Sequence, residues 1–241
     1  MSKTPDQALE KIREAQEGRH TALDLNRQNL TEVPEEVFTL DWLESLYLDF
    51  NQIKEMPESI AKLSKLRQLY LDSNLLQELP GSMVELQNMQ ELSIESNQLN
   101  KIPEPILKLQ NLQELDMSSN QLKQVPQSIS KLQNLQRLDL ASNQLQEIVE
   151  SIIELQNLKE LDLGFNQIKE LPESIAKLHN LKELDLESNQ LKELPESIAK
   201  LQKLQSLNVS SNQIKGIPEV IQKLPNLQEL YLSSKEVKEV L

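Results

Sequence analysis

The 241-residue chain contains no cysteine. It therefore cannot form disulfide bonds, which fits a reducing compartment, and it cannot use a cysteine nucleophile. With only four glycines and two histidines, the chain has few residues for phosphate-binding loops or histidine metal sites. Aromatic residues make up 3% of the sequence, so the core must be built from leucine and isoleucine.

The formal net charge is −13, and no basic stripe is present. Nucleic acid and anionic membrane surfaces are therefore disfavoured as partners. A basic protein partner is compatible with the charge, although acidic surfaces also serve solubility. The N-terminus has no apolar signal-peptide core, and no stretch approaches membrane-spanning length. We expect a cytoplasmic protein, or a secreted one if a signal peptide was removed.

Asparagine recurs every 23 residues without insertion or deletion. A fixed period in the twenties is typical of a stacked repeat. Each unit reads LxxLxLxxNxLxxLPxxIxxLxx, with small departures. The LxLxx segment alternates like a strand and must pair with the same segment of the next unit, as a parallel ladder. The following proline predicts an extended start and a short helical or 3-10 turn.

Asparagine suits the bend because a short amide carries both donors and an acceptor, and can satisfy the backbone of two coils. We interpret the eight asparagines as structural, with a ligand-binding role as the alternative. They are Asn51, Asn74, Asn97, Asn120, Asn143, Asn166, Asn189 and Asn212.

This pattern resembles the leucine-rich repeat family, in its 23-residue intracellular type with an LPxxI segment. The likeness extends to bacterial members and to the repeat regions of Ras-like and Roco-type signalling proteins, and it covers about nine tenths of the chain. It implies an α/β repeat solenoid, curved as a horseshoe, with parallel strands on the concave side. It also implies a role in protein–protein recognition.

The register divides the chain into three parts. Residues 1–18 are predicted to form an N-terminal capping helix, with Thr4 as a cap, and residues 19–232 about ten repeats. Gln28 and Lys235 replace asparagine in the atypical terminal units. Residues 233–241 are either a C-terminal cap or a truncated last repeat, in which case the chain is a fragment.

Residues between the buried leucines of a strand point outward. In the middle of the chain they form an acidic strip, which we interpret as a track for the Lys or Arg side chains of a partner. The strip comprises Asp116, Asp139, Asp162 and Asp185, flanked by Glu114, Glu160 and Glu183. Aspartate is alternatively the ordinary filler of this position, and Arg137, Lys159 and Lys182 can neutralise part of the strip. A straight column offers poor geometry for calcium or magnesium, so no metal is expected.

The N-terminal end is aromatic. Tyr47 and Tyr70 share a column on adjacent strands, and Phe50 follows at a strand exit. Exposed tyrosine is favoured as an interface anchor, which makes these three residues candidates for partner contact. Trp42 either joins them or fills the seam between cap and repeats. Phe165 is a lone second candidate.

One unit has Val149 in place of proline and carries Ile153, in a frame shared with Phe38, Val84 and Leu107. These residues form either an apolar ridge on the convex side or a filling between coils.

No constellation of an enzyme is present, and no cofactor is implied. We expect a monomeric scaffold that binds a protein through its concave face. The alternatives are the recognition region of a larger GTPase-linked signalling protein and, less favoured, a secreted or surface adhesin or effector.

Overall fold

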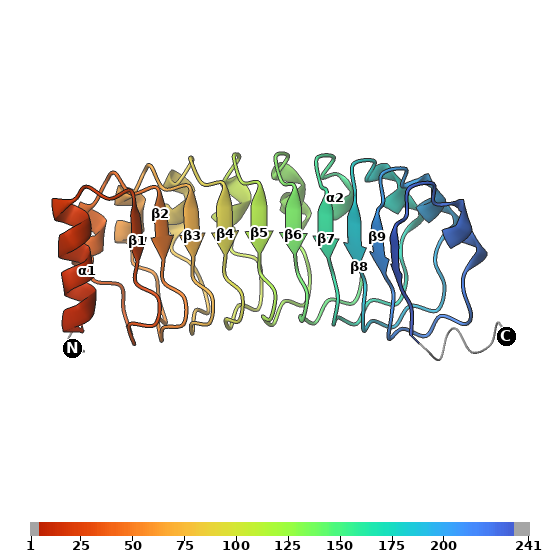
Figure 1. Ribbon diagram of the computed structural model, residues 1–241, viewed down its shortest axis with the longest axis horizontal. Helices are drawn as coiled ribbons and strands as arrows, with labels where there is room; N and C mark the ends of the chain where they lie inside the picture. The colour runs from red at the N-terminus through yellow and green to blue at the C-terminus, as the bar shows by residue number, and fades with distance from the viewer. Residues whose placement is uncertain (1–4, 234–241) are drawn as a thin grey trace. The chain divides into compact units, whose positions relative to one another are not determined.

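The computed structural model describes residues 5–233 and divides the chain into two compact units, Met1–Asn120 and Gln121–Leu241. Both units are built from coils that contribute one short strand and one short helix each (Figure 1). This repetition follows directly from the 23-residue period of the sequence.

The first unit begins with helix α1 (Asp6–Glu17), which buries Ala8, Ile12 and Ala15 and packs against the first strand. Its parallel strands pair in sequential order. They are β1 (Ala22–Asp24), β2 (Ser45–Tyr47), β3 (Gln68–Tyr70), β4 (Glu91–Ser93) and β5 (Glu114–Asp116). The 3-10 helices are η1 (Glu35–Thr39), η2 (Glu58–Lys62), η3 (Gly81–Glu85) and η4 (Ile106–Lys108).

The second unit repeats the arrangement, again with parallel strands paired in order. Its strands are β6 (Arg137–Asp139), β7 (Glu160–Asp162), β8 (Glu183–Asp185), β9 (Ser206–Asn208) and β10 (Glu229–Tyr231). Its helices are η5 (Gln127–Lys131), α2 (Glu150–Ile153), η6 (Glu173–Lys177), η7 (Glu196–Lys200) and η8 (Glu219–Lys223).

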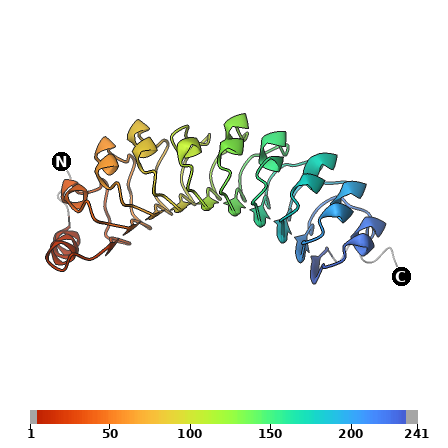
Figure 2. The same ribbon diagram turned by 90° about the horizontal axis from the view of Figure 1, so that it is seen from above.

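In each unit the strands line the inner, concave side, and the short helices lie on the outer, convex side (Figure 2). The proline of each repeat explains the convex turn. Pro57, for example, is extended (φ −76°, ψ 155°), and its carbonyl accepts a hydrogen bond from the N–H of Ile60 at 3.1 Å, which opens η2. The predicted repeat solenoid, with parallel strands, short 3-10 segments and an N-terminal helix, is thereby confirmed.

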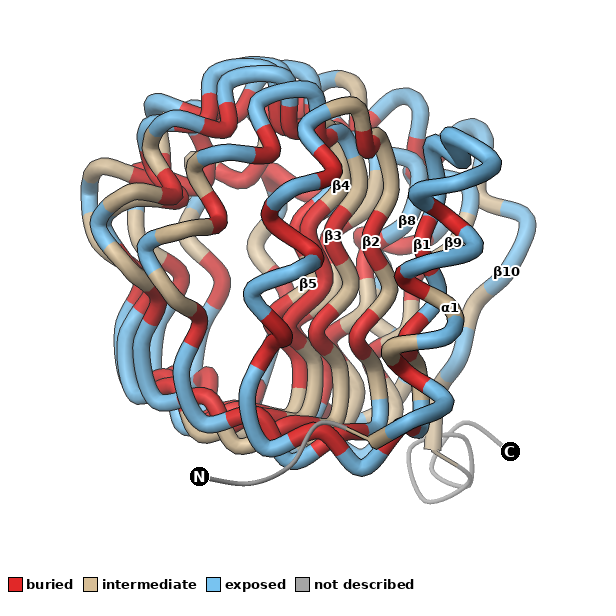
Figure 3. The backbone as a smooth tube through the Cα atoms, turned by 90° about the vertical axis from the view of Figure 1, so that its left-hand side faces the viewer, coloured by how far each residue is buried: buried red, intermediate tan, exposed pale blue. Residues whose placement is uncertain are grey.

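The core is a stack of leucines that lie in register. Leu46, Leu69, Leu92 and Leu115 occupy the centres of consecutive strands and are buried, so burial alternates along each strand (Figure 3). The residues on either side of them turn to the concave surface. This alternation sets which side chains are available to a partner.

The repeated asparagines connect neighbouring coils at the bend. Oδ1 of Asn74 accepts a hydrogen bond from the N–H of Ile53 at 3.0 Å, and Nδ2 donates to the carbonyls of Leu48 and Leu71 at 2.9 and 3.0 Å. Seven of the eight asparagines are buried, and Asn212 is half-buried. Each amide thus bonds backbone groups of two coils from one position.

Helix α1 differs in detail from the predicted cap. Pro5 stands at the N-cap position without a side-chain cap bond, and Thr4 lies outside the described residues. Trp42 lies at the junction of helix and repeats, where its Nε1 donates to the carbonyl of His20 at 3.0 Å and the guanidinium of Arg19 lies 4.9 Å from its ring centroid. Trp42 therefore fills the seam. Lys235 and the predicted C-terminal cap or truncated repeat lie beyond the described residues, apart from Ser233.

The convex apolar residues do not form a ridge. Phe38, Leu107 and Ile153 are 2%, 1% and 0% exposed, so these side chains fill the space between coils, and Val84 is half-buried. Val149, which replaces proline, keeps the extended conformation (φ −78°, ψ 146°) but is followed by the α-helical turn α2 instead of a 3-10 turn.

Candidate functional site

Three positions of each coil face the concave side: the first and third residues of the strand and the second residue after it. We call them the outer, central and exit columns. In the first unit the outer column holds Ala22, Ser45, Gln68, Glu91 and Glu114, the central column Asp24, Tyr47, Tyr70, Ser93 and Asp116, and the exit column Asn26, Asp49, Asp72, Glu95 and Ser118.

Tyr47 and Tyr70 stack on each other in the central column. Their ring centroids lie 5.0 Å apart and their planes differ by 5°. The phenol of Tyr70 donates a hydrogen bond to Oε2 of Glu91 at 2.6 Å, and Nε2 of Gln68 donates to the same oxygen at 2.8 Å. Burial, followed by the bond to Glu91 and its charge, raises the pKa of Tyr70 well above its usual range. The two tyrosines predicted on adjacent strands are therefore in contact, and a carboxylate fixes one ring.

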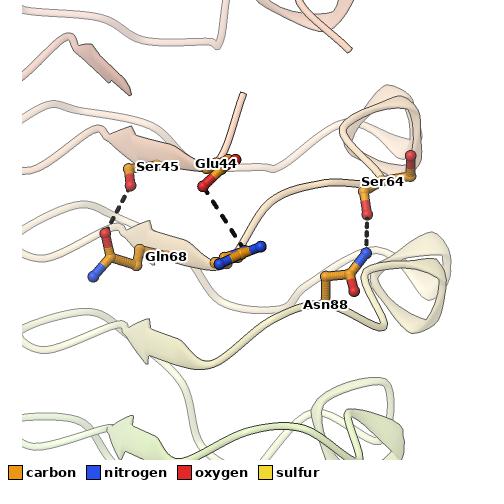
Figure 4. A network of polar contacts seen from close by, with 6 residues as sticks. Glu44, Ser45, Ser64, Gln68 and Asn88 are labelled. Atoms are coloured by element: carbon orange, nitrogen blue, oxygen red, sulfur yellow. Dashed lines mark hydrogen bonds and ion pairs between the residues drawn. The ribbon is translucent and has the colours of Figure 1, made fainter. Parts of the chain in front are cut away.

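Polar side chains continue this link from coil to coil. Oγ of Ser45 donates to Oε1 of Gln68 at 2.7 Å (Figure 4). Nearby, Nε of Arg67 lies 3.8 Å from Oε2 of Glu44, an ion pair between two largely solvent-accessible side chains. The tyrosine pair thus lies beside side-chain contacts that join equivalent positions of consecutive coils. These contacts restrict the movement of strands β2 and β3.

The central-column aspartates are bonded to their own chain. Oδ1 of Asp116 accepts from the N–H of Ser118 at 2.8 Å, and Oδ1 of Asp162 accepts from the N–H of Gly164 at 2.8 Å. Equivalent bonds are made by Asp24, Asp139, Asp185 and Asn208. The aspartate side chain therefore satisfies the exit-column N–H after the strand. This gives the filler interpretation of these residues a physical cause.

At β2, β3 and β4 the central column holds tyrosine or serine, and the acceptor comes from the preceding coil instead. Oδ1 of Asn26 accepts from the N–H of Asp49 at 2.7 Å. Asp49 accepts from the N–H of Asp72 at 2.9 Å, and Asp72 from the N–H of Glu95 at 2.8 Å. The sequence interpretation missed this exit column. Its signal was available, since Asp49 and Asp72 precede coils that lack an acidic central residue.

The exit-column acids carry unfavourable charge. Burial raises the pKa of Asp49 to about 6; the N–H of Asp72 opposes the rise, and the charges of Asp72 and Asp24 add to it. Burial also raises the pKa of Asp72 and, with repulsion from Asp116 and Asp72, that of Glu95. Three carboxyl groups are therefore crowded in the exit column beside the tyrosines, and burial opposes their ionisation.

Phe50 projects from the strand exit with its side chain beside Arg27. It is 51% exposed and has a left-handed backbone (φ 56°), where six other coils place serine. The guanidinium carbon of Arg27 lies 4.1 Å from the ring centroid. Phe165 occupies the same frame position in the second unit, 54% exposed with φ 53°. A bulky residue is disfavoured in this conformation, so both phenylalanines are poor choices for folding alone.

The second unit contains the remaining part of the acidic strip, whereas Asp116 and Glu114 belong to the first. Asp139, Asp162 and Asp185 line a shallow hollow of about 160 Å³ with Glu160 and Glu183. Arg137, Ser206, Asn208 and Tyr231 complete the polar part of its lining.

Two acids of this hollow contact polar neighbours, of which one is a cation. Nη1 of Arg137 lies 3.3 Å from Oε2 of Glu160, and Nδ2 of Asn208 donates to Oδ2 of Asp185 at 2.9 Å. Lys159, expected to neutralise the strip as well, donates to Gln136 at 2.7 Å. Tyr231, 50% exposed at one end of the hollow, was not among the predicted site residues.

Within residues 5–233, no three His, Cys, Asp or Glu side chains are grouped in a way that could hold a metal ion. No helix in that range is both long and apolar enough to cross a membrane.

Comparisons with solved structures place this fold among leucine-rich repeat proteins. A leucine-rich repeat protein of Leptospira interrogans is 31% identical, with a TM-score of 0.71 over 88% of this chain and 66% of that one. The repeat domain of the type III effector XopL is 27% identical, with a TM-score of 0.81 over 97% and 84%. The plant peptide hormone receptor RGFR1, solved in complex with RGF2, is 26% identical, with a TM-score of 0.68 over 88% and 39%.

This chain thus spans about two thirds of the Leptospira chain and well under half of the receptor chain. The comparison with curated proteins gave no match. A family model described as a leucine-rich repeat region matches residues 18–98 and 142–240, and a second, described as a leucine rich repeat, matches residues 87–145. The chain belongs to the leucine-rich repeat family.

Proposed function

We propose that this protein is a non-enzymatic scaffold that binds a protein partner through its concave face. The observation that carries this proposal is the stacked pair Tyr47 and Tyr70. These tyrosines occupy the position where five other coils place a strand-ending aspartate, and Asn26 and Asp49 supply the lost acceptors. Folding does not explain a tyrosine at a position where the preceding coil must supply the missing hydrogen-bond acceptor. Half-buried tyrosines are favoured as contact residues.

The charge of the concave face supports a partner with a basic surface. Asp116 in the first unit, and Asp139, Asp162 and Asp185 in the second, each place a carboxylate on the concave side of their own unit. Glu114, Glu160 and Glu183 flank it. A negative surface of this kind speeds association with a cationic protein and disfavours nucleic acid and anionic membranes. We further propose that the scaffold acts as a monomer.

The test compares proteins captured from source-cell lysate by the wild type and by charge variants. A combined Asp139→Asn, Asp162→Asn, Asp185→Asn variant removes three charges but keeps the acceptor after each strand, since Asn208 makes the same bond to the N–H of Ser210 at 3.1 Å. A Tyr47→Ala, Tyr70→Ala variant removes the aromatic pair. Loss of the same partner from either variant is the expected result.

The matched control removes three exposed carboxylates that lie outside the concave columns, by Glu147→Gln, Glu154→Gln and Glu170→Gln. It has the same change in net charge as the triple aspartate variant. Equal capture by the wild type, both concave variants and the control would sink the proposal, because binding would then not depend on the concave face.

A second candidate is that this chain is the recognition region of a larger signalling protein, such as one with a linked GTPase. Its support is the length of the similar proteins, since the chain spans 39% of the receptor RGFR1. An antibody raised against the repeats decides the question by immunoblot of the source cells. A band near 27.7 kDa would contradict the larger protein, and a much heavier band would support it.

We propose a cytoplasmic location, supported by the absence of cysteine from the chain. Cell fractionation with the same antibody tests it. Recovery of the protein in the culture medium or at the cell surface would contradict this location and favour the adhesin or effector alternative.

A further inference from the structure

We propose that Tyr70, with the carboxylates around it, forms a seat for an arginine side chain of the protein partner. This inference rests on the proposed function and names the chemistry that one part of the concave face recognises.

The stack on Tyr47 orients the Tyr70 ring. Tyr70 turns one face to Tyr47, so its other face points toward β4. The next residue of the central column on that side is Ser93, which is buried and whose Oγ donates to Oδ1 of Asp72 at 2.6 Å. This hydrogen bond holds the Ser93 side chain close to the sheet, so it extends less far from the sheet than the phenol ring does. The outer face of Tyr70 is therefore open to a planar group above Ser93.

Carboxylates border this ring face. Glu91 binds the phenol at 2.6 Å, and Asp116 follows Ser93 in the central column. The charge of Glu114 acts on Tyr70, and Glu95 interacts with Asp116. The fifteen positions of the three columns in the first unit contain seven carboxylates and no lysine or arginine. A positively charged group of the partner complements this surface.

Arginine fits this site better than lysine does. A guanidinium is planar, stacks on aromatic faces and donates hydrogen bonds from its edge to carboxylates, whereas an ammonium acts as a point charge. The chain itself uses this pairing at Arg27, whose guanidinium carbon lies 4.1 Å from the Phe50 centroid. Among residues 5–233, no arginine lies over the Tyr47 or Tyr70 ring, so this site is left for a partner.

The seat is also preorganised, which favours binding because little freedom remains to be lost. The bond from Tyr70 to Glu91 and the stack on Tyr47 fix the ring, and the bond from Gln68 to Glu91 at 2.8 Å fixes the carboxylate. Tyr70→Phe removes the phenol bond but keeps the ring face. This separates the loss of stacking from the loss of the hydrogen bond.

The experiment selects binders from a random heptapeptide phage library on the wild-type protein and measures the chosen peptides by fluorescence polarisation. We expect the selected peptides to share an arginine, and replacement of that arginine by lysine to weaken binding by about tenfold. Tyr70→Ala should weaken binding by a similar factor and Tyr70→Phe by less. The control with Glu147, Glu154 and Glu170 changed to glutamine, outside the concave columns, should have no effect. Binding should also weaken as salt is raised.

The unfolding midpoints of the three variants are measured first. Peptide binding is then compared only for variants whose midpoint matches that of the wild type within error. Peptides without a shared arginine, a library that yields no binder, or equal binding by the wild type and Tyr70→Ala would each overturn the arginine seat. If the peptides are instead lost from the variant with Asp139, Asp162 and Asp185 changed to asparagine, the concave-face function stands while this inference fails. The proposed concave-face function fails separately if neither concave variant changes which proteins are captured from the lysate.

Discussion

Asp49 and Asp72 are joined across two coils, because Oδ1 of Asp49 accepts a hydrogen bond from the backbone N–H of Asp72 at 2.9 Å. Asn26 makes the same bond one coil earlier, to the N–H of Asp49 at 2.7 Å. An amide therefore meets the same backbone need as a carboxylate. The carboxylate adds a charge in a half-buried column where desolvation opposes it.

This relationship predicts how stability depends on pH. The pKa of Asp49 is raised from 3.8 to about 6 in the folded protein, so folding favours the protonated form. The stabilising contribution of protonated Asp49 is full below about pH 4 and is lost as the pH rises through about 6. We expect Asp49→Asn to be more stable than the wild type at pH 7 and to lose this advantage near pH 4.

Urea unfolding at several pH values between these limits measures the effect. The control is Asp41→Asn, which makes the same change on an exposed residue outside the concave columns. A stability difference between Asp49→Asn and the wild type that stays constant with pH would show that the charge of Asp49 is not what opposes folding.

The asparagine ladder predicts a large loss from an isosteric change. Asn97 is buried, its Oδ1 accepts from the N–H of Leu76 at 2.9 Å, and its Nδ2 donates to the carbonyls of Leu71 and Glu95 at 2.9 and 3.0 Å. Asn97→Asp removes both donors and places a carboxylate against carbonyl oxygens. We expect a loss of roughly 3 kcal/mol in the free energy of unfolding.

Chemical denaturation of Asn97→Asp and Asn88→Asp checks this expectation. Asn88 is exposed and donates a single bond to the carbonyl of Ser64 at 2.8 Å, so its change should cost less than about 1 kcal/mol. Similar losses from both variants would contradict the role of the buried amide.

The sequence predicted the fold well because the frame is enforced by burial. A leucine such as Leu69 has one environment, between Leu46 and Leu92, and a shift of one residue would turn it to solvent. The asparagine contacts followed from the same register. The ladder of strands could therefore be derived from one repeat unit and its period.

The candidate site was less predictable, since it depends on bonds between different coils. The sequence placed Tyr47 and Tyr70 in one column, but it did not indicate the bond from Tyr70 to Glu91. Nor did it indicate that an aspartate such as Asp162 bonds the N–H two residues later. Side-chain contacts of this kind depend on rotamers, which periodicity does not determine.

The convex side supplies a prediction about packing. Ile153, the last residue of α2, is fully buried in a frame position where Val84 is only half-buried. Ile153→Ala removes packed methyl groups and leaves a cavity, at a cost of about 2 to 5 kcal/mol. Val84→Ala is the matched variant and should cost clearly less. Thermal and urea unfolding measure both, and an equally small effect of the two changes would support an exposed ridge instead.

The exposed phenylalanines predict a separation of stability from binding. Phe165 is 54% exposed in a left-handed conformation that serine adopts in six other coils, so Phe165→Ser should change the free energy of unfolding by no more than about 0.5 kcal/mol. Phe38→Ala, which empties a buried position, should cost about 3 to 5 kcal/mol. If Phe165 is held at the surface for a partner, Phe165→Ser should reduce partner capture although the fold is as stable as before. A loss of stability comparable to that of Phe38→Ala would instead mean that the Phe165 ring packs within the fold, and would remove it from the contact surface.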